Sequence, residues 1–207
     1  MTDLAVELTP NELEHDDGHA HPTSTGISNE KLAMWAFLGS ECLLFGGLIS
    51  TFLLYKERAS GGETPHDLYD LAFTSISSFV LLMSSLTMVL AVSAIARGDH
   101  RSLRAWLATT ALLGTIFISG QVYEFTEFLN EGYGFTTAPA WSAFYALTGF
   151  HGVHVTLGIV MLLSCLALSL RGRIPQERAE AVEIVGLYWH FVDIVWVLIF
   201  TVVYLIK

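Results

Sequence analysis

Charged residues are scarce in this sequence: Asp, Glu, Lys and Arg make up 14% of its 207 residues. Hydrophobic residues make up 53%, and the mean hydropathy is +0.53. A soluble globular domain usually contains about 25% charged residues. The composition therefore excludes an ordinary soluble domain and indicates an integral membrane protein.

Cysteine is also rare, and the two that occur, Cys42 and Cys165, both lie within apolar runs. Thiols in such positions are typical of small hydrophobic side chains buried between helices, and they predict neither a disulfide nor a metal site. The sequence also lacks nucleophile constellations, phosphate-binding loops and nucleic-acid-binding motifs. No hydrolase, nucleotide-binding or nucleic-acid-binding function is therefore indicated.

Lys and Arg are absent from residues 1–30, which also have no apolar core, and these absences exclude a secretory signal there. The segment is polar and acidic, so we predict a disordered N-terminal arm ahead of a membrane domain at residues 31–207. Histidines 15, 19 and 21 could bind a transition metal, but a solvated segment without a specific ligand is the preferred interpretation. Because the arm supplies much of the net charge of -10, we infer no basic partner from it.

Long apolar runs dominate the rest of the chain, and glycine or proline lies in each connection between them. A helix needs roughly 20 apolar residues to cross the hydrocarbon core of a bilayer. The fold class predicted is an all-α membrane protein, a bundle of five transmembrane helices with a polar N-terminal arm. No inverted repeat is visible, which weighs against a common transporter architecture. The predicted spans are residues 32–55, 71–96, 103–129, 140–170 and 182–206.

The distribution of Lys and Arg predicts the orientation of the bundle. Seven of these residues flank the spans on the side of the N-terminal arm, and three lie on the opposite side. Since positive charge is enriched in cytoplasmic loops, the N-terminus is expected in the cytoplasm and the C-terminus outside.

Ionisable residues inside the spans are the candidate functional residues. Asp193 lies mid-span with His190 one helical turn away, on a face flanked by Trp189 and Trp196. A carboxylate in lipid costs about 2.5–3.5 kcal/mol on insertion scales, so it is expected to face protein. Glu41 in the first span lies at a depth similar to His190, and we expect it in the same polar pocket as His190 and Asp193.

Further polar residues lie in the third and fourth spans. Gln121 and Glu124 are three residues apart on one helical stripe, and His151 and His154 have the same spacing. The sequence predicts a contact from Glu124 to His151 or His154. The second span is rich in Ser and Thr without charge, which is typical of close helix packing.

A haem or copper site made by the membrane histidines is disfavoured. His151 and His154 project from one helical face and cannot both be axial ligands of one haem. The expected depth of His190 matches theirs poorly. We therefore predict no metal site and no redox centre in this chain.

The chain resembles subunit 3 of the haem–copper respiratory oxidases, the cytochrome c oxidase and quinol oxidase family. The resemblance covers about residues 30–207 and looks like the five-helix bacterial form, which lacks two N-terminal helices of the longer mitochondrial form. The stretches that support it are Ser40-Glu41-Cys42-Leu43-Leu44-Phe45, the Ser/Thr-rich second span, Gln121-Val122-Tyr123-Glu124-Phe125, Gly149-Phe150-His151-Gly152-Val153-His154-Val155 and Trp189-His190-Phe191-Val192-Asp193-Ile194-Val195-Trp196.

The resemblance implies a non-catalytic core subunit of a proton-pumping terminal oxidase, which reduces O2 to water in aerobic respiration. It implies a bacterial inner or plasma membrane location, direct packing on subunit 1, and contact with subunit 2, small subunits or a supercomplex. Haem and copper would be held by partner subunits, and phospholipid could bind. The subunit as a whole would support proton uptake and resistance to turnover inactivation. Glu41 matches the family's carbodiimide-reactive membrane carboxylate and is expected to support proton uptake. The other six candidates, Gln121, Glu124, His151, His154, His190 and Asp193, are expected to form a buried polar network.

Several alternatives stay open at this stage. Glu41 and the Gln-x-x-Glu arrangement resemble the cytochrome c oxidases of the aa3 type more than the quinol oxidases. A small proton-coupled transporter, or a membrane b-type cytochrome, would be a different class of protein. A transporter predicts flux from the isolated chain, whereas a cytochrome predicts a haem spectrum.

Overall fold

Five membrane-spanning helices make up the part of the chain that the computed structural model describes, residues 28–56, 71–173 and 179–205. No strand occurs in these ranges, and the predicted all-α, five-span fold is confirmed. Most of the predicted N-terminal arm lies outside the described residues. The helices are α1 (Asn29–Tyr55), α3 (Leu71–Ala96), α4 (His100–Asn130), α5 (Pro139–Leu170) and α6 (Ala179–Phe200), with a π-helical turn, η2 (Thr201–Leu205), continuing α6.

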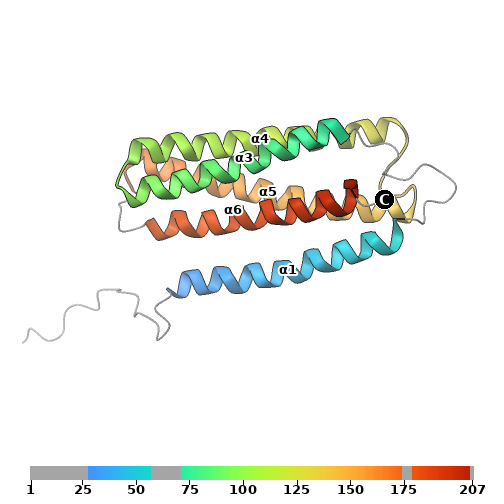
Figure 1. The fold of residues 1–207 in the computed structure, drawn as a ribbon, viewed down its shortest axis with the longest axis horizontal. Coiled ribbons are helices and arrows are strands. Elements are labelled where there is room, and N and C mark those ends of the chain that lie inside the picture. The colour runs from blue at the N-terminus through green and yellow to red at the C-terminus, as the bar shows by residue number, and fades with distance from the viewer. Residues whose placement is uncertain (1–27, 57–70, 174–178, 206–207) are drawn as a thin grey trace, which may run out of the picture.

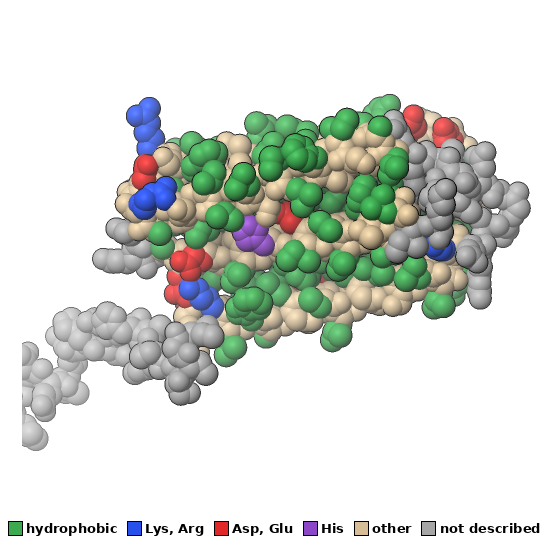
Figure 2. Space-filling model, in the orientation of Figure 1, with side chains coloured by type: hydrophobic (Ala, Val, Ile, Leu, Met, Phe, Trp, Pro, Cys, Tyr) green, Lys and Arg blue, Asp and Glu red, His purple; other side chains and the backbone are tan. Residues whose placement is uncertain are grey.

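The helices run roughly along one long axis (Figure 1). α3 and α4 lie side by side at one edge, α1 lies at the opposite edge, and α5 and α6 lie between them. α6 contacts α1, α3 and α5. In Figure 2, hydrophobic side chains cover the face between the two ends, and Lys, Arg, Asp and Glu side chains gather mainly at those ends. This distribution fits a multi-pass membrane protein.

Side chains cap two of the helices. Ser28 caps α1, accepting a hydrogen bond from the backbone N–H of Lys31 at 3.3 Å, and its hydroxyl also donates to Glu180 at the start of α6. Asp99 caps α4, and hydrogen bonds from the Ser102 hydroxyl, the Ser102 N–H and the Arg101 N–H hold the pKa of Asp99 below its usual range. Since the lowered pKa favours the carboxylate, this cap stabilises α4 above the ordinary Asp pKa and is lost as pH falls through the lower folded value.

Trp189 of α6 occupies the centre of the bundle and is fully buried. Its indole N–H donates to the Ser84 hydroxyl of α3 at 3.0 Å. The ring lies between two glycines: a Cβ on Gly114 of α4 would stand 2.6 Å from the ring, and a Cβ on Gly158 of α5 would stand 2.7 Å from it. One side chain therefore contacts three neighbouring helices, and two of these contacts require the absence of a Cβ.

The Ser/Thr-rich α3 packs through its hydroxyl groups, as the sequence indicates. Besides the Ser84 contact, Ser78 accepts the indole N–H of Trp196 at 2.9 Å. Thr87 of α3 and Thr110 of α4 lie 2.7 Å apart, oxygen to oxygen. Such hydrogen bonds between helices are worth about 0.6 kcal/mol on average in a membrane protein, so the close packing they accompany matters as much as the bonds.

The expectation that both cysteines are buried is wrong for one of them. Cys165 of α5 is buried, but Cys42 of α1 is exposed, and both are free thiols. α1 lies at the edge of the bundle and buries only Leu38, Phe45 and Phe52. Cys42 follows Glu41 by one residue and therefore points away from the face that contacts the bundle.

Candidate functional site

Glu41 and His154 form a contact between α1 and α5, about halfway along each of these two helices. The Glu41 Oε2 atom lies 3.1 Å from His154 Nε2, and both side chains are mostly buried, with 14% and 11% exposed. The ring of Phe45, one turn along α1, packs edge-on against the His154 ring at 5.0 Å between centroids. The Tyr188 hydroxyl of α6 donates to the His154 carbonyl at 3.0 Å.

The hydrogen bonds of His154 determine how many protons this pair holds. Its Nδ1 atom lies 2.7 Å from the Phe150 carbonyl, which can only accept, so Nδ1 carries a hydrogen. The contact between Nε2 and Glu41 then needs one further proton, placed either on the imidazole or on the carboxyl group. In both cases the pair holds one shared proton and has no net charge.

This geometry corrects one prediction from the sequence, which placed Glu41 in the pocket of His190 and Asp193. Similar depth in the bilayer does not decide which neighbouring helix a side chain faces. α1 contacts both α5 and α6, and the turn that carries Glu41 and Phe45 faces α5.

His151 lies one turn before His154 and is fully buried, and its side chain contacts two neighbouring helices. Its Nε2 lies 3.2 Å from the Val192 carbonyl of α6, so Nε2 carries the hydrogen and donates it. Its ring packs on Trp196 at 4.9 Å and against Phe117 at 6.0 Å between centroids. Nδ1 has no hydrogen-bond partner among the described residues. The side chain joins α4, α5 and α6.

Gln121 connects α4 to the backbone of α5. Its amide nitrogen donates to the Thr148 carbonyl at 2.7 Å. A Cβ on Gly152 of α5 would stand only 2.9 Å from the Gln121 amide oxygen. The glycine lets the two helices approach closely enough for this hydrogen bond.

Glu124 does not contact His151 or His154, and that prediction is wrong. Its carboxylate accepts from the Thr74 hydroxyl of α3 at 3.1 Å and from the Tyr204 hydroxyl of η2 at 3.3 Å. α4 packs against α3 on one side and α5 on the other. Gln121 points to α5, and Glu124, about 60° away around the helix, points to α3 and the C-terminal turn.

Replacing Tyr204 with phenylalanine is expected to destabilise the protein by about 0.5–2 kcal/mol, because a buried carboxyl group loses a hydroxyl donor. Thermal unfolding of the detergent-purified protein measures the effect. Tyr123→Phe is the matched control, since Tyr123 is an exposed tyrosine of α4. Equal melting temperatures for both variants would contradict this role of Tyr204.

His190 and Asp193 of α6 face α3. Nδ1 of His190 lies 2.7 Å from the Ser85 hydroxyl, and the ring is partly exposed. Asp193 is 3% exposed, and neither of its carboxyl oxygens has a hydrogen-bond partner in the described parts of the chain. Within the described residues, no hydrogen bond joins any two of the six residues predicted to form a buried polar network.

The three membrane histidines have different neighbours: Glu41 for His154, the Val192 carbonyl for His151 and Ser85 for His190. Within the described ranges, no group of three or more His, Cys, Asp or Glu side chains is placed to hold a metal ion. Of these three contacts, the one between His154 and Glu41 joins two ionisable side chains.

Sequence reasoning missed Tyr188, Tyr204 and Ser85 as members of these contacts. Tyr204 lies near the end of the last span, and Glu124 lies near the end of the third span. Both spans end on the same side of the membrane, and this could have indicated that the two residues lie close together. Ser85 is one of many hydroxyl residues in α3, and nothing in the sequence distinguishes it. The contacts to the Thr148 and Val192 carbonyls involve backbone groups, which any residue provides.

Comparison with known proteins gives consistent matches over almost the whole chain. The family model described as cytochrome c oxidase subunit III matches residues 11–207. The chain is 39% identical to cytochrome c oxidase subunit 3 of Bacillus sp. (strain PS3), over 86% of each chain. It is 40% identical to quinol oxidase subunit 3 of Bacillus subtilis (strain 168), over 93% of this chain and 95% of that one. It is also 34% identical to cytochrome bo(3) ubiquinol oxidase subunit 3 of Pseudomonas aeruginosa, over 94% of this chain and 91% of that one.

Proposed function

The chain belongs to the cytochrome c oxidase subunit III family and is a subunit 3 of a haem–copper oxidase, and from this premise we propose that it serves a proton-pumping aa3-type cytochrome c oxidase. In this role it is a non-catalytic core subunit of an enzyme that reduces O2 to water. It packs directly on subunit 1 and supports proton uptake.

The observation that carries the proposal is the contact between Glu41 and His154. A carboxyl and an imidazole that share one proton can accept or release it with little movement of other groups. The pair lies within the membrane, between helices, at 3.1 Å. Such a pair suits a subunit that supports proton traffic in a neighbouring catalytic subunit, because it needs no redox centre of its own.

The proposal extends to partners, cofactors and orientation. Subunit 1, and with it the haems and copper, lies beside this chain in the complex, and subunit 2, small subunits or a supercomplex complete it. This chain binds no redox cofactor, and phospholipid fills the exposed apolar surface that partner subunits leave. The N-terminus lies in the cytoplasm and the C-terminus outside, in the bacterial inner or plasma membrane, as the excess of Lys and Arg on the N-terminal side supports.

A second candidate function is subunit 3 of a quinol oxidase. The relatives named quinol oxidase subunit 3 are as similar to this chain as those named cytochrome c oxidase subunit 3, with 40% and 39% identity. The electron donor binds to other subunits, so the two candidates differ in the partner and not in the contacts described above.

The purified complex tests the proposal. Affinity purification of the tagged full-length chain in mild detergent is expected to yield a haem–copper subunit 1 with an a-type haem spectrum, and O2 consumption with reduced cytochrome c. Consumption with a quinol alone would replace the first candidate with the second. A chain that purifies without a haem-bearing partner would contradict both.

A further inference from the structure

We propose that a groove between α1, α3 and α6 binds an isoprenoid quinone, whose ring carbonyl or hydroxyl group forms a hydrogen bond with His190. The site is separate from the contact between Glu41 and His154. It uses only side chains of this chain and does not depend on which electron donor the oxidase uses. The quinone is held there as a lipid of the membrane and not as a redox cofactor.

The groove has the size and the lining of a small-molecule site. Its volume is about 520 Å3. Ligand sites in proteins commonly measure about 300–1,000 Å3, with mostly apolar walls and a few polar groups. The apolar lining comes from all three helices and includes Trp35 of α1, Val89 of α3 and Leu187 of α6. Trp35 is 56% exposed and Val89 is 51% exposed, so the described residues leave both open to a ligand.

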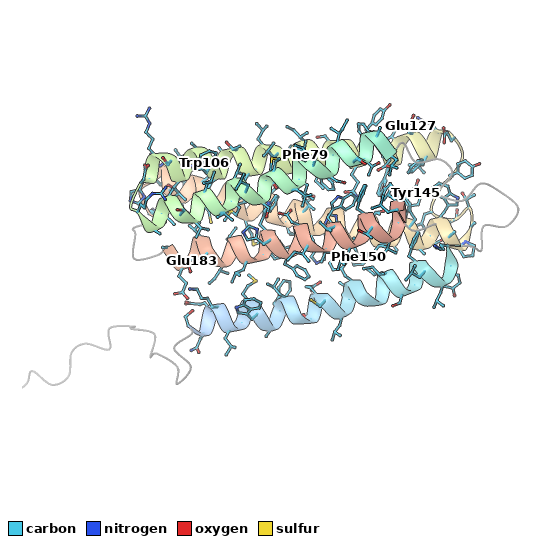
Figure 3. All side chains as sticks on the ribbon, viewed as in Figure 1. Phe79, Trp106, Glu127, Tyr145, Phe150 and Glu183 are labelled. Carbon is cyan, nitrogen blue, oxygen red and sulfur yellow. The ribbon has the colours of Figure 1, made fainter. Side chains whose placement is uncertain are left out.

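Polar groups lie at both ends of the groove. At one end Lys31 and Glu183 form an ion pair at 2.7 Å. The Glu183 side chain points from the start of α6 toward α1 (Figure 3). His190 also lines the groove, two helical turns further along α6, or about 10 Å along the helix axis. It lies close to the middle of the span Ala179–Leu205. Figure 2 shows a histidine side chain that reaches the surface over α6, among hydrophobic side chains. The groove therefore runs from a charged end to an imidazole near the middle of the membrane.

One ring nitrogen of His190 is available to a ligand. Nδ1 lies 2.7 Å from the Ser85 hydroxyl of α3, and Nε2 makes no hydrogen bond with the described residues. When the Ser85 hydroxyl donates to Nδ1, the neutral imidazole carries its hydrogen on Nε2 and can donate it to a ligand. When Ser85 accepts from the Nδ1 hydrogen, Nε2 becomes an acceptor. His190 thus suits a quinone carbonyl in the first tautomer and a quinol hydroxyl in the second.

The depth of His190 favours a quinone over a phospholipid. The polar head of a phospholipid lies at the edge of the hydrocarbon core, which is about 30 Å thick. An acyl chain in the groove would therefore place only CH2 groups beside His190 and leave Nε2 without a hydrogen bond, which is unfavourable away from water. A quinone has an apolar isoprenoid tail, a flat ring that can stack on the Trp35 indole, and two carbonyl oxygens. Its ring can reach the middle of the membrane and satisfy His190.

Photolabelling of the full-length chain, purified in mild detergent, tests this site. The probe is an azido derivative of ubiquinone with a short isoprenoid tail, and mass spectrometry maps the labelled positions. We expect saturable labelling of the parts of α1, α3 and α6 that line the groove. Excess unlabelled decylubiquinone should remove this labelling, whereas an equal excess of phosphatidylglycerol should not compete.

Two pairs of variants locate the bound quinone. Val89→Trp is expected to abolish saturable labelling, because the indole fills the groove. Leu86→Trp is its matched control, since Leu86 is 53% exposed on the same helix and is not among the residues that line the groove. His190→Leu is expected to weaken binding of the probe by about twofold to tenfold, because one hydrogen bond is lost. His100→Leu, at the start of α4, is the control for it.

The outcomes separate a quinone site from an apolar surface that takes any lipid. Loss of labelling in Val89→Trp and weaker binding in His190→Leu, with wild-type binding in both controls, support the proposal. It is overturned if labelling does not saturate, if Val89→Trp keeps it, or if His190→Leu binds the probe as tightly as the wild type. It is also overturned if a control variant has the same effect as its counterpart. Displacement of the probe by phosphatidylglycerol would overturn it too, because the groove would then hold acyl chains.

Discussion

Gly158→Ala is expected to destabilise the bundle by about 1–3 kcal/mol and to lower the amount of chain recovered with its oxidase complex. The added Cβ would stand 2.7 Å from Cε3 and 2.8 Å from Cζ3 of Trp189. The indole cannot move aside easily, because Gly114 of α4 lies against its other end and Ser84 of α3 holds its N–H. Gly114→Ala is expected to have a similar effect.

Thermal unfolding of the purified protein and the yield of the complex measure this effect. Gly149→Ala is the matched control on the same helix, because a Cβ there would meet nothing within 4 Å. Gly158→Ala combined with Trp189→Phe should lose less stability than the sum of the two single variants, since the smaller ring leaves room for the methyl group. If Gly158→Ala unfolded at the same temperature as Gly149→Ala, Trp189 would not have the central packing role described above.

Glu41→Gln is expected to leave assembly and electron transfer intact but to shorten, several-fold, the number of turnovers before the oxidase inactivates. A glutamine amide can still donate to Nε2 of a neutral His154, so the contact between α1 and α5 persists. It cannot take up or release the shared proton. Glu41→Ala, which also removes the hydrogen bond, should in addition lower stability by about 1–3 kcal/mol.

Oxidase activity followed over sustained turnover separates these effects. Glu127→Gln is the control, because this carboxylate is exposed near the end of α4 (Figure 3). If Glu41→Gln inactivated after as many turnovers as the wild type, the pair would have no proton-holding role. Its role in packing α1 against α5 would not be affected by that result.

The sequence was sufficient to predict the helices of the fold and to single out the buried acidic and histidine side chains, which are Glu124, His151, His154 and Asp193. Apolar length alone defines five spans, and lone polar residues within them mark the faces that meet protein. Asp193 is an example. Placing a carboxylate in lipid costs free energy, so this side chain is expected to face protein, and it is 3% exposed.

The pairing of these residues could not be predicted, because depth along a helix does not fix its rotation about its axis. The sequence predicts Glu41 at the depth of His190, and the packing of α1 on α5 brings it to His154 instead. Glu124 likewise reaches Thr74 and Tyr204 because α4 lies between α3 and α5. Hydroxyl groups and backbone carbonyls provide most of the remaining partners, and neither kind of group stands out in a sequence.

A double-mutant cycle on Glu41 and His154 tests most directly that ionisable groups in this membrane domain are stabilised by one another. The free energy of unfolding in mixed micelles would be measured for the wild type, Glu41→Ala, His154→Ala and the double variant. We predict a favourable coupling energy of about 0.5–2 kcal/mol between the two side chains. Additive losses, with no coupling beyond experimental error, would contradict the pairing on which the proposed function depends.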